Sequence, residues 1–206
     1  MKQGLPFYRL ASAAISLTLS ISACSLANAE ELKCAGAFAP DTDHARLVAT
    51  FGAENVVRET IPAEGEDEQV TAVFPRDPAR RIEILWSDEA AGRNLAALRV
   101  SGSFWSVKGI RVGASLTDVE KVNGNPFTLH GFGWDLGGEV QSWHGGAMAQ
   151  PAGKCRVVVV FQTGREATVE AYHAVQVSPG KQEFRSDFPA MRVVNPTVRI
   201  IGLVNR

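Results

Sequence analysis

The chain has 206 residues, of which 45% are hydrophobic and 21% are charged, and its formal net charge at pH 7 is -1. This composition excludes an intrinsically disordered chain and predicts a globular protein. The first 29 residues carry Lys2 and Arg9 and no acid, so the net charge without them is -3. No basic stripe remains to neutralise phosphates, and we therefore expect no nucleic-acid partner.

The first 29 residues have the pattern of a secretory signal peptide. Lys2 and Arg9 form a positive region, residues 10–21 are apolar, and Ala27-Asn28-Ala29 is an A-x-A cleavage site. The apolar stretch is too short for a membrane span. We therefore predict residues 1–29 as a signal peptide, residues 30–206 as a single domain, and a periplasmic or secreted location.

A second interpretation of the same segment involves lipid. Residues 21–24, Ile-Ser-Ala-Cys, resemble a bacterial lipobox, and cleavage there would leave Cys24 as a lipidated N-terminus. The protein would then be an outer-membrane lipoprotein, and only in that case do we expect contact with a membrane. The site after Ala29 matches its pattern better, so we favour loss of Cys24 with the peptide.

Two cysteines remain after either cleavage. An even pair in an oxidising compartment predicts a disulfide, here between Cys34 and Cys155. The bridge would close a loop of about 120 residues. The sequence has no C-x-x-C motif, so we do not expect a role in thiol exchange.

The first half of the domain predicts a helix followed by a hairpin. Asp43 and its neighbours offer capping oxygens, and Gly52 supplies a stop. In chain order we expect a helix at about 42–51, an acidic loop at 62–69, paired strands at 70–74 and 82–86, a loop at 88–94, and strands at 98–100 and 104–110.

The second half repeats this pattern and ends in further strands. A capping box at Thr117 and Glu120 opens a short helix that Gly124 ends, 72 residues after Gly52. We then expect hairpin strands at 127–134 and 139–143 around a turn at 135–138, a central strand at 155–161, a strand at 168–177, a helical turn near 186–189, and a closing strand at 198–204.

Together these elements predict an α+β fold. We expect a twisted antiparallel sheet that carries a few short helices on one face. The repeated helix-plus-hairpin pattern is consistent with an internal duplication, with halves at about 40–108 and 109–206.

A short segment resembles known envelope proteins. Residues 109–116, Gly-Ile-Arg-Val-Gly-Ala-Ser-Leu, with Val119 and the Gly-Asn-Pro of 124–126, resemble a pattern of the SmpA or BamE-like lipoprotein family. In that pattern a strand is followed by Gly, Ser or Thr, a short helix and Gly-x-Pro. The tandem units of the β-lactamase inhibitor protein fold are similar. The resemblance covers about twenty residues in each half and implies a fold, but no catalytic residue.

The segment 130–146 holds the densest group of unusual residues. If residues 135–138 form a tight turn, His130 and His144 would face each other across the hairpin. With Asp135 or Glu139 they would make a weak candidate for a divalent metal site, although the spacing matches no standard motif. The alternative is that both histidines are ordinary strand residues, and we expect no cofactor.

Aromatic residues are stronger candidates for recognition. Trp105, Phe132, Trp134 and Trp143 lie in glycine-rich segments near turns, and tryptophan is enriched at binding hot spots. Core packing is the alternative for each of them. Serine neighbours suggest that Trp105 and Trp143 are partly exposed.

No diagnostic catalytic motif is present in this sequence. We expect a non-enzymatic module that binds an envelope protein or a cell-wall component through a concave sheet and the 130–146 hairpin. The alternatives are a small periplasmic hydrolase, which would use carboxylates such as Asp135 and Glu139 or a His-bound metal, and a purely structural outer-membrane lipoprotein.

Overall fold

The computed structural model describes residues 30–63, 65–178 and 180–205. The predicted signal peptide, both cleavage sites and Cys24 lie outside the described residues. In chain order the elements are β1 (Glu30–Glu31), η1 (Gly36–Phe38), α1 (His44–Phe51), η2 (Ala53–Asn55), β2 (Val56–Pro62), β3 (Asp67–Val73), β4 (Ile82–Asp88), β5 (Arg93–Val100), β6 (Trp105–Ser106), α2 (Leu116–Asn123), β7 (Thr128–His130), β8 (Val140–Ser142), η3 (Ala147–Ala149), β9 (Cys155–Gln162), α3 (Val169–Ala174), β10 (Glu183–Arg185), α4 (Pro189–Val194) and β11 (Thr197–Asn205).

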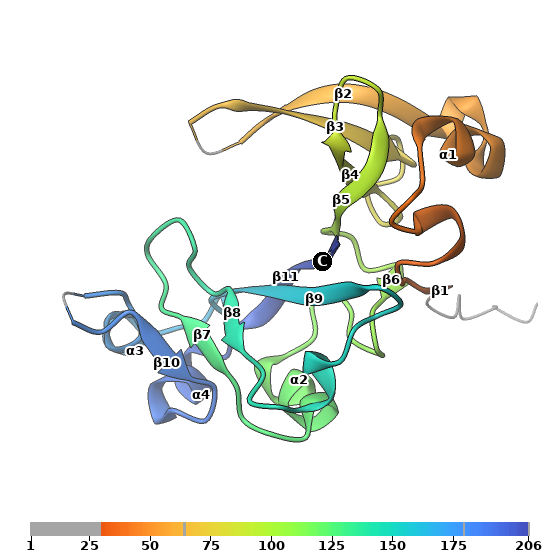
Figure 1. The fold of residues 1–206 in the computed structure, drawn as a ribbon. Helices are drawn as coiled ribbons and strands as arrows, with labels where there is room; N and C mark the ends of the chain where they lie inside the picture. The colour runs from red at the N-terminus through yellow and green to blue at the C-terminus, as the bar shows by residue number, and fades with distance from the viewer. Residues whose placement is uncertain (1–29, 64, 179, 206) are drawn as a thin grey trace, which may run out of the picture.

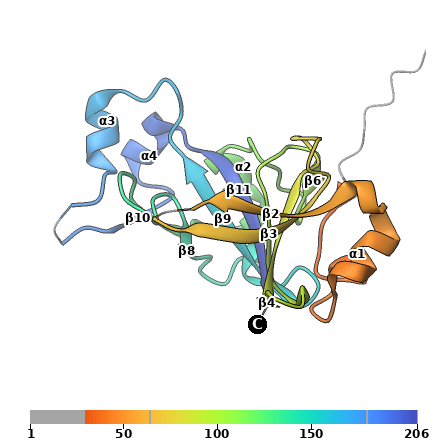
Figure 2. The same ribbon diagram turned by 90° about the horizontal axis from the view of Figure 1, so that it is seen from above.

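The fold is α+β, as predicted, and is organised around one twisted antiparallel sheet (Figures 1 and 2). The strand order of this main sheet is β2-β3-β4-β5-β11-β9. A three-stranded sheet, β10-β7-β8, and the parallel pair β1-β6 complete the described strands. Among the described residues, no helix has the length and hydropathy needed to cross a membrane.

Side-chain alternation gives the main sheet a core face. Ile82 pairs with both Val73 and Val100, and Leu203 pairs with both Leu98 and Val157, so these side chains point the same way. All of them are buried. The large side chains that pack with them in the core include Phe38, Leu47, Leu116, Phe127 and Met148, and α1 and α2 lie on this side of the sheet in Figure 1.

The predicted disulfide is present. Cys34 and Cys155 are bonded, with a Cα–Cα distance of 5.7 Å and a sequence separation of 121. Both cysteines are fully buried. The bond ties the segment that follows β1 to the first residue of β9.

Two strand positions in the main sheet differ from the prediction. The segment 198–204, expected to close the sheet, is the interior strand β11, whereas the segment 155–161, expected at the centre, is the end strand β9. Val157 and Val159 of β9 are buried, while Val158 and Val160 are half-exposed on the other face. β-Branched residues on both faces therefore indicated an interior strand, although β9 is an end strand whose second face is only half-buried.

Two further local predictions are wrong. Residues 168–177 contain the helix α3 instead of a strand, because the Thr168 hydroxyl caps it by accepting a hydrogen bond from Ala171 N. The expected strand at 104–110 stops at Ser106, because Lys108 and Gly109 take positive φ values of 51° and 80° and close a tight turn.

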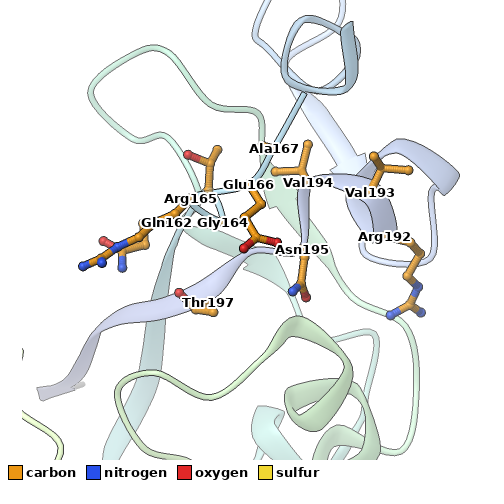
Figure 3. Close-up of a pocket in the computed structure, with 11 residues that line it drawn as sticks. Gln162, Gly164, Arg165, Glu166, Ala167, Arg192, Val193, Val194, Asn195 and Thr197 are labelled. Carbon is orange, nitrogen blue, oxygen red and sulfur yellow. The ribbon is translucent and has the colours of Figure 1, made fainter. Parts of the chain in front are cut away.

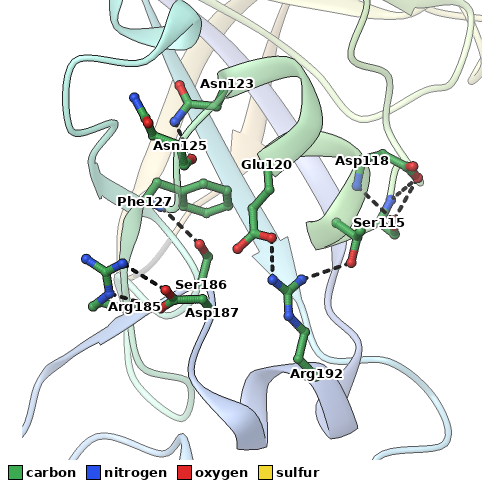
Figure 4. Close-up of polar contacts among 11 residues, drawn as sticks. Ser115, Asp118, Glu120, Asn123, Asn125, Phe127, Arg185, Ser186, Asp187 and Arg192 are labelled. Carbon is green, nitrogen blue, oxygen red and sulfur yellow. Dashed lines mark hydrogen bonds and ion pairs between the residues drawn. The ribbon is translucent and has the colours of Figure 1, made fainter.

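The cap of α2 is two residues earlier than predicted. The Ser115 hydroxyl accepts a hydrogen bond from Asp118 N at 3.1 Å, and the Asp118 carboxylate accepts one from Ser115 N at 3.3 Å (Figure 4). Hydrogen bonds from the Ser115 side chain and backbone hold the pKa of Asp118 below its ordinary value. Thr117 and Glu120 bind Arg192 instead, so they tie α2 to α4.

We predict that replacing both disulfide cysteines by serine lowers the free energy of unfolding by up to about 4–5 kcal/mol, because the bridge restricts a long loop in the unfolded chain. Urea denaturation of the variant and of the native chain measures the difference. Equal stabilities would contradict a structural role for the bond.

We predict that Ser115→Ala lowers the free energy of unfolding by about 1 kcal/mol, since it removes the side-chain cap of α2. Thr117→Ala is the matched control and should cost less, because it removes only an exposed hydrogen bond to Arg192. If Thr117→Ala proved the more costly in thermal denaturation, the capping assignment would be wrong.

Candidate binding surface

The main sheet curves in Figure 1, and we call its concave face, which lies opposite the core, the trough. Leu85 pairs with Ala97, Ala97 pairs with Val204, and Val160 pairs with Ile200. These residues come from four different strands and are only half-buried. We call the following six residues the apolar floor of the trough: Leu85, Ala97, Val158, Val160, Ile200 and Val204.

The curvature of the sheet brings distant strands together across the trough. A cavity of about 240 Å³ is lined by Ile61, Pro62, Glu83, Arg99, Val100, Ser101 and Ile200. Ile61 belongs to β2, the first strand of the sheet, and Ile200 belongs to β11, the fifth. The β2–β3 hairpin therefore overhangs the floor, as Figure 1 shows.

A chain of ion pairs, which we call the charged belt, crosses the trough beside the floor. Its members are Glu59, Arg81, Glu83, Arg99 and Glu68. Glu83 is the central member, since its carboxylate accepts from Arg81 Nε at 3.1 Å and from Arg99 Nε at 2.6 Å. Arg81 also binds Glu59, and Arg99 also binds Glu68.

The belt raises the pKa of both arginines. Burial alone would lower the pKa of the Arg99 guanidinium, but hydrogen bonds to Glu83 and Glu68 and their negative charges outweigh it. The same balance with Glu59 and Glu83 raises the pKa of Arg81. Both guanidinium groups therefore remain charged, and the belt keeps its pattern of alternating charges.

A loop of residues 131–139, between β7 and β8, forms a rim at one side of the trough (Figure 1). Glu139 forms a bridge with Val160, which places the loop against the floor. Trp134 is 42% exposed and Leu136 is 45% exposed on this loop. The ring of Trp134 meets that of His130 edge-on, with 5.6 Å between the centroids.

His130 and His144 do not face each other as predicted. Thr128 pairs with Ser142, and His130 N donates to the Glu139 carbonyl at 2.9 Å. A bulge between Thr128 and Leu129 shifts the register, so the exposed His144 ring lies at the Thr128 hydroxyl, 2.7 Å away. No group of three His, Cys, Asp or Glu residues able to hold a metal occurs among the described residues, and Asp135 is exposed on the rim.

The four aromatic candidates occupy different environments. Trp105, expected to be partly exposed, is 2% exposed and donates to the Arg80 carbonyl at 2.6 Å. Phe132 is buried, and Trp143 is half-buried against Phe127 at 5.1 Å between ring centroids. Only Trp134 of the four is exposed. The prediction for Trp105 is wrong because its serine neighbours do not report which way its side chain points.

Another cavity lies beyond the end of β9 (Figure 3). It has a volume of about 680 Å³ and is lined by Gln162, Thr163, Gly164, Arg165, Glu166, Ala167, Arg192, Val193, Val194, Asn195 and Thr197. Thr197 pairs with Gln162, and both follow the alternation of the trough face. In Figure 3 the Glu166 carboxylate points toward Asn195 and Thr197. Asp135 and Glu139, the predicted carboxylate pair, line neither this cavity nor the smaller one.

Sequence reasoning missed this cavity and the charged belt. Residues 163–167 carry no motif. The two ends of the belt pair with arginines that lie far away in the sequence: Glu59 and Arg81 are 22 positions apart, and Glu68 and Arg99 are 31 positions apart. No protein-family model, curated protein or solved structure matches the chain. The geometry of the trough therefore carries the functional argument.

We predict that Trp105→Ala lowers the free energy of unfolding by about 3–5 kcal/mol, because it empties a core site and removes a buried hydrogen bond. Trp134→Ala should change it by less than about 1 kcal/mol, since the side chain is exposed. Chemical denaturation of both variants tests the assignment, and equal losses of stability would contradict it.

Proposed function

We propose that this protein is an exported, non-enzymatic module that binds another protein through the trough. The observation that carries the proposal is the apolar floor: six aliphatic side chains on the face opposite the core are only half-buried. Contiguous apolar patches on soluble proteins mark interaction sites. A patch bordered by charged side chains also resembles the apolar core and polar rim of protein interfaces.

The chemistry of the floor favours a protein over a cell-wall glycan. The side chains of the floor are all aliphatic, and they gain free energy by removing apolar surface of a partner from water. A saccharide presents mainly hydroxyl groups, which an aliphatic floor cannot satisfy. A cell-wall component, the other partner that the sequence suggested, is therefore an outcome to test.

The N-terminal geometry supports export. Glu30, the residue that follows the predicted cleavage site, begins β1 and pairs with Trp105. The Glu31 carboxylate accepts hydrogen bonds from Lys108 N at 2.9 Å and from the Ser106 hydroxyl at 3.0 Å. The disulfide also fits an exported protein. Lipidation at Cys24, in line with the resemblance to SmpA or BamE-like lipoproteins, would hold the trough near a membrane surface.

We predict that a photo-crosslinking amino acid at position 158 or 160 joins the protein to one and the same partner in intact envelopes. The same group at position 122, on α2 at the core side of the sheet, is the matched control and should give no such product. Mass spectrometry identifies the partner. Val158→Glu should then weaken binding of the purified partner by tenfold or more, about 1.4 kcal/mol.

Val158→Thr is the second variant, because threonine keeps the β-branched shape if glutamate disturbs β9. Thermal denaturation shows that each variant is folded. Crosslinks of equal yield at positions 122 and 158 would contradict the proposal. Co-sedimentation with purified peptidoglycan that Val158→Glu abolishes would replace the protein partner by the cell wall.

A further inference from the structure

The charged belt contains one more negative charge than positive charges. Three carboxylates alternate with two guanidinium groups, so the belt has a formal net charge of -1. Glu83 lies between the two arginines and is neutralised from both sides. The excess charge therefore belongs to the two ends of the belt, Glu59 and Glu68.

Each end of the belt has room for another donor. Glu59 contacts Arg81 through Oε1, and Glu68 contacts Arg99 through Oε2. The second oxygen of each carboxylate has no protein partner among the described residues. The side chains of Glu59 and Glu68 are 29% and 28% exposed, so a group from outside can reach them.

The surroundings of the belt are apolar at its centre and acidic at its Glu68 end, where Glu66, Asp67 and Glu89 line a second cavity with Glu68. Ile61 and Ile200 line the 240 Å³ cavity together with Glu83 and Arg99 of the belt. The carboxylates around Glu68 add to the excess negative charge at that end, and this charge attracts a cationic group. Lysine and arginine suit such a place, because their aliphatic stems cover apolar surface while the charged end reaches a carboxylate.

We propose that the partner inserts a lysine or arginine side chain into the trough, next to an apolar side chain that packs on the floor. The cationic group pairs with Glu59 or Glu68 and completes the alternation of charges. This inference rests on the proposed function and adds the chemistry of the partner, a protein segment that is basic and apolar. Charge complementarity of this kind selects partners and sets their register.

A phage-displayed library of random disulfide-closed heptapeptides, selected on the immobilised protein without its signal peptide, tests the inference. We expect enriched peptides to carry Lys or Arg beside an aliphatic or aromatic residue. Synthetic copies of these peptides should lose binding to Val158→Glu. They should bind about tenfold more weakly to the double variant Glu59→Gln, Glu68→Gln, and this loss should shrink at high salt.

Glu170→Gln is the control, because Glu170 lies on α3, is exposed, lines neither cavity at the belt and belongs to no ion pair of the described residues. Its affinity for the peptides should equal that of the native protein. Peptides that need Val158 but carry no basic residue, or that bind the double variant unchanged, would overturn the inference and leave the proposed function intact. If no enriched peptide depends on Val158, both proposals fail.

Discussion

The insertion of β11 between β5 and β9 is the interaction on which the rest of the structure depends. Ile201 pairs with Val100 on one side and with Val159 on the other, so the last strand of the chain joins two separate parts of the sequence. Its final residue, Asn205, pairs with Cys155, which the disulfide ties to Cys34. The segment that follows β1 and the end of β11 are therefore both bonded to the start of β9, one through the disulfide and the other through strand pairing.

This arrangement places most of the core on one face of the sheet, although Val70 and Ala72 of β3 are buried on the other face. Phe127 and Phe161 stack with 5.7 Å between ring centroids on the covered side, and Trp86 donates to the buried Thr71 hydroxyl at 2.9 Å. On the other face, Arg99 and Val158 lie on either side of Gly202, which adds no side chain between them. The floor residues of the trough remain only half-buried, and this leaves part of their surface available to a partner.

Local features of the fold could be predicted from the sequence, and long-range ones could not. Alternation at 82–86, the glycine stops after α1 and α2, and the cysteine pair are signals within one segment, and the structure confirms them. The trough depends on which strands become neighbours. Val158 and Val159 look alike in sequence, and only the pairing of β9 with β11 shows that one faces the trough and the other the core. The internal duplication remains a prediction.

The most direct test of the account is carbene footprinting of the four floor residues on β9 and β11, compared between the purified protein and the intact envelope. The account predicts that Val158, Val160, Ile200 and Val204 are labelled in the purified protein and protected in the envelope. Val122, which is exposed on α2, should be labelled equally in both. Equal labelling of the floor in both preparations would contradict the claim that the trough is a binding surface.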